Sequence, residues 1–519
     1  MSELMKNEKS PPVVDVESLS TKNSTLQNDM VELEDGDIAL TKKMHLINNA
    51  LDEIGFTWFH FKYMIIAGYG YAAESLIGLA HSTVSLAINI QFHQSFSVTT
   101  EVSYVGLLLG SIFFGMTADI IGRKLAFNTT LLASSCFGFF VGGSSNYVMY
   151  LIFLMITSFF VGGNLAIDAS VFLETLPSRY TWLVTFFACF WSFGQLVGYV
   201  VAYGFMVPEK WNGCTDFDAI CDSAKNRGWR YTWYVDSGIL LGLSLIRLFL
   251  QLDETPKYLI VNNQDEEAMK LLQKIATKYN RNLSLTLEQL QECGSVDKNK
   301  YSKKDPKIKD FFKAATSNLK YLFATKKMKW NTTLLLTSWF GIGIAYPLYG
   351  IFLPQYLAAK GATTSASTNL GIYSDAMMSN GLSAFGPVIG AALILTPKIG
   401  RKGALCIGGI LSMVFLMCYT TVRTRAQNQA FTVVSYITIY IYYGVLYAFT
   451  PEVLPSYCRA TGSGLCAVVC RIGGLIVPLI AYFSNTSTPV PIYVCAGCIG
   501  FLGIIALFFP FDPSKQRSV

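Results

Sequence analysis

Long apolar stretches separated by short polar ones dominate the chain from about residue 61 onward. A helix needs about 20 mostly apolar residues to span the hydrocarbon core of a bilayer. Twelve stretches meet this requirement, at about residues 63–90, 102–121, 125–144, 147–173, 183–206, 231–252, 332–357, 370–396, 403–422, 430–451, 461–483 and 489–510. The pattern predicts an all-α integral membrane protein with twelve transmembrane helices.

The polar stretches divide the chain into five parts. These are a polar tail (1–60), a six-helix bundle (61–252), a linker rich in Lys, Asp and Glu (253–330), a second six-helix bundle (331–511) and a short polar tail (512–519). Within the first tail, residues 39–54 carry apolar residues at helical spacing. This amphipathic segment is expected to lie against the membrane surface or the base of the protein.

The composition supports this interpretation and excludes several classes of function. The chain has 52% hydrophobic and 14% charged residues, whereas an average soluble domain carries roughly 25% charge. The net charge of +6 is concentrated in short stretches, which indicates topology rather than nucleic-acid binding. Only four histidines occur, and no phosphate-binding G-x-x-x-x-G-K-[ST] loop is present. We therefore expect no enzyme activity, metal, cofactor or nucleic-acid partner.

The distribution of Lys and Arg predicts the orientation. The linker is dense in Lys, and Arg123, Lys124, Arg401 and Lys402 fall on its side of a twelve-helix arrangement. The positive-inside rule makes this side cytoplasmic, so both termini are expected there. The chain is then a multi-pass protein of the plasma membrane or of an endomembrane.

Two short motifs recur at one offset. Gly122-Arg123-Lys124 reappears as Gly400-Arg401-Lys402, 278 residues later (400 − 122). The segment ETLPS at residue 174 reappears as EVLPS at residue 452, again 278 residues later (452 − 174). Two parallel repeats of six helices are typical of rocker-type secondary transporters, whose site lies between the halves near the bilayer midplane. The offset therefore predicts two bundles related by a pseudo-twofold axis.

Four segments resemble those of a known family. The segment 115–124 (GMTADIIGRK) resembles the signature loop between helices two and three of the major facilitator superfamily. The segment 254–259 (ETPKYL) resembles the one after helix six in its sugar-porter and organic-ion branches. Residues 54–71 and 451–464 are similar to the branch of the synaptic vesicle two-related protein, particularly its fungal members. The resemblance spans about residues 45 to 515 and implies the major facilitator fold.

Ionisable groups inside predicted helices are candidates for proton or solute binding, because each costs about 2.5–3.5 kcal/mol to insert. Glu74 and Asp168 can accept a proton or contact the solute; alternatively, each is the buried partner of a basic or amide group. Arg471, the lone charge of the last two predicted helices, either clamps a solute carboxylate or forms a salt bridge between the halves. Asp236 and Asp375 are weaker candidates, since either can lie near a helix end.

Aromatic residues complete the candidate solute site. Trp339 and Tyr346 occupy the seventh predicted helix, and four tyrosines at 436, 440, 443 and 447 share one face of the tenth. Such a stripe is typical of helix packing, and it also suits a ring-bearing, sugar-like or cationic solute. The predicted proton and solute residues are Glu74, Asp168, Gln195, Trp339, Tyr346, Tyr443 and Arg471.

Charged residues at the helix ends are expected to form a cytoplasmic gate, the alternative being plain solvated loop charges. An exposed ion pair is worth about 0–1 kcal/mol, which suits a switch between two states of similar energy. The predicted gating residues are Gly115, Asp119, Gly122, Arg123, Lys124, Glu174, Glu254, Pro256, Lys257, Glu452 and Arg459. Thr181 stands where many relatives carry Arg, which implies a different latch in the first half. On the opposite side, Cys214 and Cys221 either form a disulfide or remain free.

These features together predict a monomeric secondary active transporter that moves a small organic solute across the lipid bilayer by alternating access. Three versions remain open: coupling to protons, uniport by the same fold, and a membrane sensor or vesicle protein that no longer transports.

Overall fold

The computed structural model describes residues 38–94, 98–121, 123–214, 221, 224–249, 254–296, 319–359, 369–422, 424–455, 458–483, 488 and 490–511. Over these residues the regular structure is helical, apart from one isolated bridge between Asn212 and Asn226. Nine helical segments of the described part are long and apolar enough to cross a bilayer. The prediction of an all-α membrane fold is confirmed.

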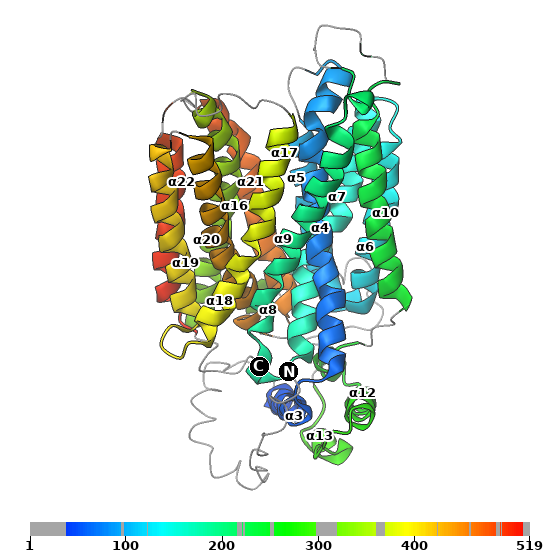
Figure 1. Ribbon diagram of the computed structural model, residues 1–519. Helices are drawn as coiled ribbons and strands as arrows, with labels where there is room; N and C mark the ends of the chain where they lie inside the picture. The colour runs from blue at the N-terminus through cyan, green and yellow to red at the C-terminus, as the bar shows by residue number, and fades with distance from the viewer. Residues whose placement is uncertain are drawn as a thin grey trace.

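Two groups of helices stand side by side in Figure 1. We call the first group the first half: α4 (Trp58–Gln91), α5 (Thr99–Ile121), α6 (Arg123–Gly142), α7 (Tyr147–Thr175), α8 (Leu183–Phe186), α9 (Ala188–Met206) and α10 (Gly228–Phe249). The second half consists of α16 (Lys326–Ala359), α17 (Asn369–Ser383), α18 (Phe385–Leu395), α19 (Gly400–Cys418), α20 (Arg425–Glu452), α21 (Arg459–Phe483) and α22 (Val490–Ile505).

Several boundaries differ from the predicted spans. The spans 183–206 and 370–396 are each divided, into α8 and α9 and into α17 and α18. The second break precedes Pro387, whose missing N–H cannot continue the helical ladder back to Ser383. In contrast, α16 is longer than its predicted span of 332–357. It begins at Lys326, because polar residues before the apolar stretch continue the helix.

The halves meet along α5 with α21 and along α9 with α17. Gly115 on α5 faces Gly464 on α21, and a Cβ on either would come within 2.8 Å of the other's Cα. Paired glycines at this point let the two backbones approach closely, as small residues do at membrane helix interfaces. The contact joins the predicted signature loop of the first half directly to the second half.

Large apolar side chains cover the outer surface of both halves. Those exposed by more than half include Phe140, Phe193, Phe249, Phe385, Phe501 and Phe508. A soluble monomer rarely exposes so much contiguous apolar surface, whereas lipid tails accommodate it. The protein is therefore a multi-pass integral membrane protein.

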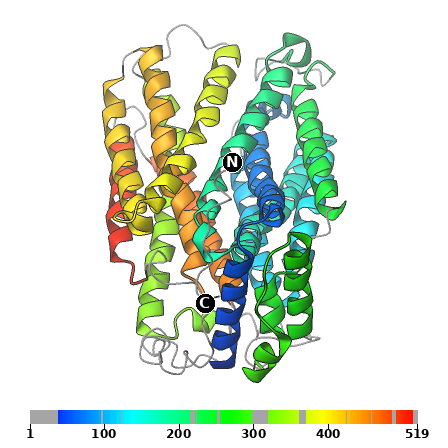
Figure 2. The same cartoon turned by 60° about the horizontal axis from the view of Figure 1, so that its bottom comes forward.

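A small helical layer lies beneath the first half, as Figures 1 and 2 show. It contains α3 (Ile38–Ile54), α11 (Pro256–Val261), α12 (Asp265–Lys278) and α13 (Leu287–Glu292). The apolar side chains of α3 are buried in this layer: Met44, Ile47, Leu51 and Ile54 are at most 1% exposed. Lys43 Nζ lies 2.6 Å from Asp265 Oδ2. The amphipathic segment thus packs on the base of the protein rather than on the membrane.

Candidate functional site

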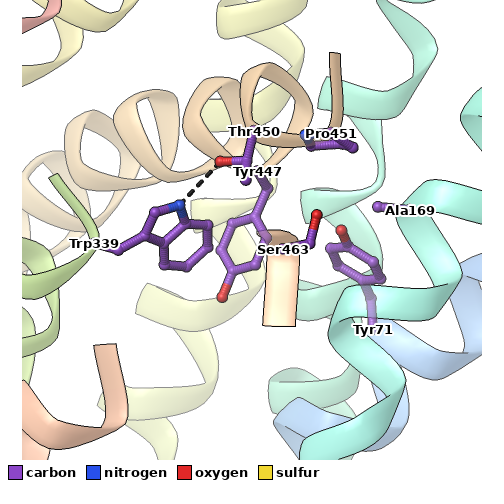
Figure 3. A pocket seen from close by; sticks show the side chains of 7 residues that line it. All are labelled: Tyr71, Ala169, Trp339, Tyr447, Thr450, Pro451 and Ser463. Atoms are coloured by element: carbon purple, nitrogen blue, oxygen red, sulfur yellow. Dashed lines mark hydrogen bonds between the residues drawn. The ribbon is translucent and has the colours of Figure 1, made fainter. Parts of the chain in front are cut away.

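A small cavity lies between the two halves. It is lined by Tyr71 and Ala169 of the first half and by Trp339, Tyr447, Thr450, Pro451 and Ser463 of the second (Figure 3). Its volume is about 20 Å³, room for about one water molecule. A solute can enter only if the halves separate.

Aromatic rings form the walls of the cavity, as Figure 3 shows for Trp339, Tyr447 and Tyr71. The Trp339 indole N–H donates to Thr450 Oγ1 at 2.9 Å, which fixes the indole against α20. The ring centroids of Trp339 and Tyr447 are 4.6 Å apart, and those of Tyr447 and Tyr71 are 5.8 Å apart. The second of these contacts crosses between the halves.

The tyrosine stripe of α20 continues the aromatic surface. The ring centroid of Tyr443 lies 5.5 Å from that of Tyr346 on α16 and 6.4 Å from that of Trp191 on α9. Tyr440 donates its hydroxyl proton to Gln195 Oε1 across the halves at 2.6 Å. The stripe therefore faces the interface between the halves, together with the candidate residues Gln195, Tyr346 and Tyr443.

An ion pair joins the halves beside this aromatic surface. Arg471 Nη2 on α21 donates to Glu74 Oε1 on α4, and the side chains of Arg471 and Glu74 are 12% and 4% exposed. Neither Glu74 Oε2 nor Arg471 Nε has a hydrogen-bond partner among the described residues, although both atoms are buried. Two residues singled out separately in the sequence thus form one polar contact with unused hydrogen-bonding capacity.

Asp168 has a different partner, and it lies within the first half. Arg247 Nη2 on α10 lies 3.2 Å from Asp168 Oδ1, and both side chains are fully buried. Arg247 also donates to the carbonyl oxygens of Ile66 and Phe127, at 3.1 and 2.9 Å. This arrangement favours the alternative role for Asp168, a buried partner of a basic group.

The other two carboxylates occupy contrasting places. Asp375 pairs with Arg425 at 3.2 Å near a helix end, and both side chains are at least one-third exposed. Asp236 is fully buried on α10, and neither of its oxygens has a hydrogen-bond partner among the described residues. Neither residue lines the central cavity.

Two buried ion pairs lie at the end of the interface next to the linker, which we call the lower end; together they form the lower gate. Glu174, at the end of α7, accepts from Arg459 Nη1 at 3.3 Å and from Thr255 Oγ1 at 2.7 Å. Glu452, at the end of α20, accepts from Arg401 Nη2 at 2.7 Å. These side chains are at most 7% exposed, so the described gate consists of buried pairs rather than the exposed pairs that the sequence suggested. Breaking a buried pair costs more than breaking an exposed one.

Thr181 takes part in this gate. Arg401 Nη2 also donates to Thr181 Oγ1 at 2.7 Å, so a cation of the second half reaches the first half. Thr181 and Arg459 are separated by the repeat offset of 278 residues (459 − 181). Where the second half supplies Arg459 to Glu174, the first half supplies a hydroxyl acceptor to Arg401, so the two gate contacts are not equivalent.

The remaining gating candidates are described only in part. Lys124 donates its backbone N–H to Glu254 Oε1 at 3.2 Å, which ties α6 to the start of the linker. Pro256 opens α11, and Lys257 beside it is buried. Gly122 and the side chains of Asp119 and Arg123 lie outside the described part of the chain.

Contacts also cross between the halves on the other side of the cavity. Tyr373 on α17 donates its hydroxyl proton to the Thr83 carbonyl on α4 at 2.9 Å. Further along α17, Ser383 Oγ at its last residue donates to Ser192 Oγ on α9 at 2.9 Å. Bonds between described residues thus join the halves on both sides of the small cavity, and we call this closed state the occluded arrangement. A disulfide joins Cys214 and Cys221 in the segment between α9 and α10.

Comparison with known proteins identifies the family to which this architecture belongs. The model of the sugar (and other) transporter family matches residues 52–518, most of the chain. The chain belongs to this family, part of the major facilitator superfamily. Members of the family are membrane transporters and not enzymes.

Two relatives and one solved structure illustrate the range of the family. The MFS siderochrome iron transporter 1 of Ceriporiopsis subvermispora is 34% identical over 97% of both chains. The synaptic vesicle 2-related protein of Bos taurus is 23% identical over 94% of this chain and 86% of its own. The proton:xylose symporter XylE of E. coli, bound to 6-bromo-6-deoxy-D-glucose, superposes with a TM-score of 0.65 at 15% identity, covering 88% of this chain and 97% of its own. The resemblance deduced from the motifs is confirmed.

In this member of the sugar transporter family, the sequence did not indicate Arg247 and Arg401 as the partners of Asp168 and Glu452. Arg247 ends an apolar segment, where a basic residue usually interacts with the helix end. Arg401 was used only for the repeat and for the orientation of the chain. Thr181 could have indicated Arg401. It stands where many relatives carry an arginine of the gate, so another cation is needed at that position.

Replacing Thr181 by Val is expected to loosen the lower gate of this transporter. The change removes the acceptor for Arg401 across the halves and keeps the Arg401–Glu452 pair, which costs about 1 kcal/mol, or about a fivefold shift in population. Cys189, whose thiol donates to the Ala384 carbonyl across the halves, reports opening. In a background lacking the other free cysteines, Cys189 should react about fivefold faster with a polar thiol reagent. Thr181→Ser keeps the hydroxyl and should react like the parent; equal rates for Val and Ser would contradict the assignment.

Proposed function

We propose that the chain is a proton-coupled secondary transporter that carries a small organic solute by alternating access of its two halves. The Glu74–Arg471 ion pair between the halves carries this proposal. In the occluded arrangement the carboxylate is neutralised by the guanidinium. When the halves separate, the carboxylate loses this partner and takes up a proton instead, because an unpaired charge is costly in the membrane interior.

The geometry and the relatives support the proposal in different ways. The aromatic cavity at the interface provides a place for a solute, and the bonds on both of its sides provide two gates. The solved neighbour XylE is a proton:xylose symporter, whereas the relative from Ceriporiopsis is a siderochrome iron transporter. Relatives with such different solutes support transport and do not single out one solute.

The proposed topology puts α3, α12 and α13 in the cytoplasm, with both termini. The positive-inside prediction supports this orientation. So does the disulfide between Cys214 and Cys221, because the segment between α9 and α10 then faces the non-cytoplasmic side, where oxidation is possible. We propose a monomer, since each chain contains both halves and the whole cavity between them.

Reconstitution of the full chain in liposomes tests the proposal. A panel of labelled anionic, neutral and cationic solutes is offered with the lumen more alkaline than the outside, with and without a protonophore. We expect at least one solute to accumulate and the protonophore to abolish the accumulation. Equilibrating uptake that ignores the gradient would establish a uniporter instead, and specific binding without uptake of any solute would establish a sensor. Asp375→Asn serves as a matched carboxylate control, since its ion pair is exposed and neither of its residues lines the cavity.

A further inference from the structure

We infer that the solute is a ring-bearing monocarboxylate, which takes Arg471 from Glu74 and enters together with one proton. This inference rests on the proposed function and specifies its solute. It comes from the charges buried at the interface between the halves and from the shape of the side chains around them.

Arg471 is the described buried arginine whose partner a solute can replace. Arg247 pairs with Asp168 within the first half, and Arg401 and Arg459 pair with Glu452 and Glu174 in the lower gate. Arg471 instead pairs with Glu74 beside the cavity, and its Nε has no hydrogen-bond partner in the described part of the chain. Guanidinium binds a carboxylate most strongly through two parallel hydrogen bonds. A solute carboxylate that displaces Glu74 can accept from both Nη2 and Nε of the Arg471 guanidinium.

The two charges of the pair respond differently to a solute. A guanidinium stays protonated in proteins, whereas a carboxylate can be neutralised by a proton. A cationic solute that paired with Glu74 would leave Arg471 as an uncompensated buried charge. An anionic solute that paired with Arg471 would leave Glu74 beside a second carboxylate, and one proton from the aqueous side relieves that repulsion. The site therefore accepts an anion with a proton and rejects a cation.

The charge balance makes the transported pair electroneutral. Before binding, Glu74 and Arg471 sum to zero; after binding, the solute anion and Arg471 sum to zero, with Glu74 protonated. Other titratable groups lie near Glu74, namely Tyr71 on its own helix, Tyr104 on α5, Asp168 on α7, Tyr447 on α20 and Cys470 on α21. Phenols and thiols keep their protons near neutral pH, and Asp168 is held by Arg247. Glu74 is the group that remains to carry the proton.

The walls of the cavity point to a ring. Tyr71 is one helical turn from Glu74, and Tyr447 is within electrostatic range of both Glu74 and Arg471. Trp339 and Trp191 flank Tyr447, with ring centroids 4.6 and 5.6 Å away. Aromatic side chains prefer stacked or edge-to-face contacts with a planar ring. Once the halves separate, a ring held against Tyr447 therefore lies close enough to the ion pair for an attached carboxylate to reach Arg471.

Three planar molecules of the same shape test the charge preference: benzoate, benzamide and benzamidinium. Binding to the purified full chain is measured by calorimetry near neutral pH, in two buffers of different ionisation enthalpy, which gives the number of protons taken up. Binding is the readout because neutral benzoic acid crosses bilayers unaided. We expect benzoate to bind at least about tenfold more tightly than the other two, with about one proton taken up per molecule.

Variants separate the two roles. Glu74→Gln should bind benzoate without proton uptake, and Arg471→Gln should lose about tenfold or more in benzoate affinity, with Arg471→Lys in between. Asp375→Asn should behave like the parent. Equal affinity for the three molecules, failure to bind benzoate, or binding without a proton in the parent chain would overturn the inference; the parent measurements decide this even if a variant does not fold.

The liposome panel distinguishes this failure from failure of the proposed function. If a neutral or cationic solute accumulates with the pH gradient while benzoate does not bind, the proton-coupled transporter stands and the solute class is wrong. If benzoate binds with one proton but no solute on the panel accumulates, the charge assignment of the site stands and the proposed transport is wrong.

Discussion

Replacing Glu74 by Gln is expected to abolish solute accumulation while preserving exchange of solute across the membrane. For a transporter that moves one proton with each solute, each pH unit of gradient supports about tenfold accumulation. Gln cannot exchange a proton, so the accumulation ratio should fall to about one at any gradient. The halves can still alternate with solute bound, so exchange of labelled for unlabelled solute should continue. Uptake into proteoliposomes and exchange at zero gradient are the two measurements.

The controls for this variant follow from the ion pair. Gln leaves Arg471 without its anion in the empty carrier, which is costly for a buried cation. The double variant Glu74→Gln with Arg471→Gln removes this cost and shows whether any loss of expression arises from the unpaired guanidinium. Glu74→Asp keeps an ionisable group and should keep some accumulation. Full gradient-driven accumulation by the Gln variant would show that the proton travels elsewhere.

The fold follows largely from patterns in the sequence. Apolar length indicated the helices, and the 278-residue offset indicated two related halves. The break at Pro387 was missed because the apolar run continues across it. The environment of α3 could not be chosen from its own residues, because its apolar face suits a bilayer surface and a protein surface equally. The deciding surface is provided by buried residues of α12, such as Leu272 and Ile275.

The site was predictable as residue types but not as pairs. Glu74 and Arg471 were each singled out because a charge inside a membrane-spanning helix is costly and usually forms a pair or lines a cavity. Their pairing joins positions 397 residues apart and depends on how α4 and α21 face each other. The burial of the gate was missed for the same reason: Glu174 and Glu452 end their helices, and the arginines that cover them, Arg459 and Arg401, lie far away in the sequence.

The placement of the buried ion pairs separates two kinds of role. Asp168 and Arg247 both belong to the first half, so their pair can persist while the halves move as units. Glu74–Arg471, Glu174–Arg459 and the Arg401–Thr181 bond cross between the halves and must exchange partners when the halves separate. A pair within one half is suited to holding that half together, and a pair between halves is suited to coupling and gating.

This distinction predicts that Asp168 is needed for stability rather than for coupling. Asp168→Leu leaves Arg247 buried without its anion, and Arg247→Met leaves the carboxylate alone, so each single change should cost about 3–5 kcal/mol. The double variant removes both charges and should recover most of the loss, because apolar residues of similar volume often replace a buried pair at no cost. Unfolding by denaturing detergent measures all three variants.

Transport by the double variant then decides the role of Asp168. If the carboxylate only holds α7 against α10, the double variant reconstituted in liposomes should accumulate solute with the pH gradient as the parent does, although it has no ionisable group at residue 168. A double variant that is as stable as the parent but equilibrates solute without accumulation would assign the proton to Asp168. The double variant thus separates stability from coupling, because it recovers the stability of the parent while it lacks the carboxylate at residue 168.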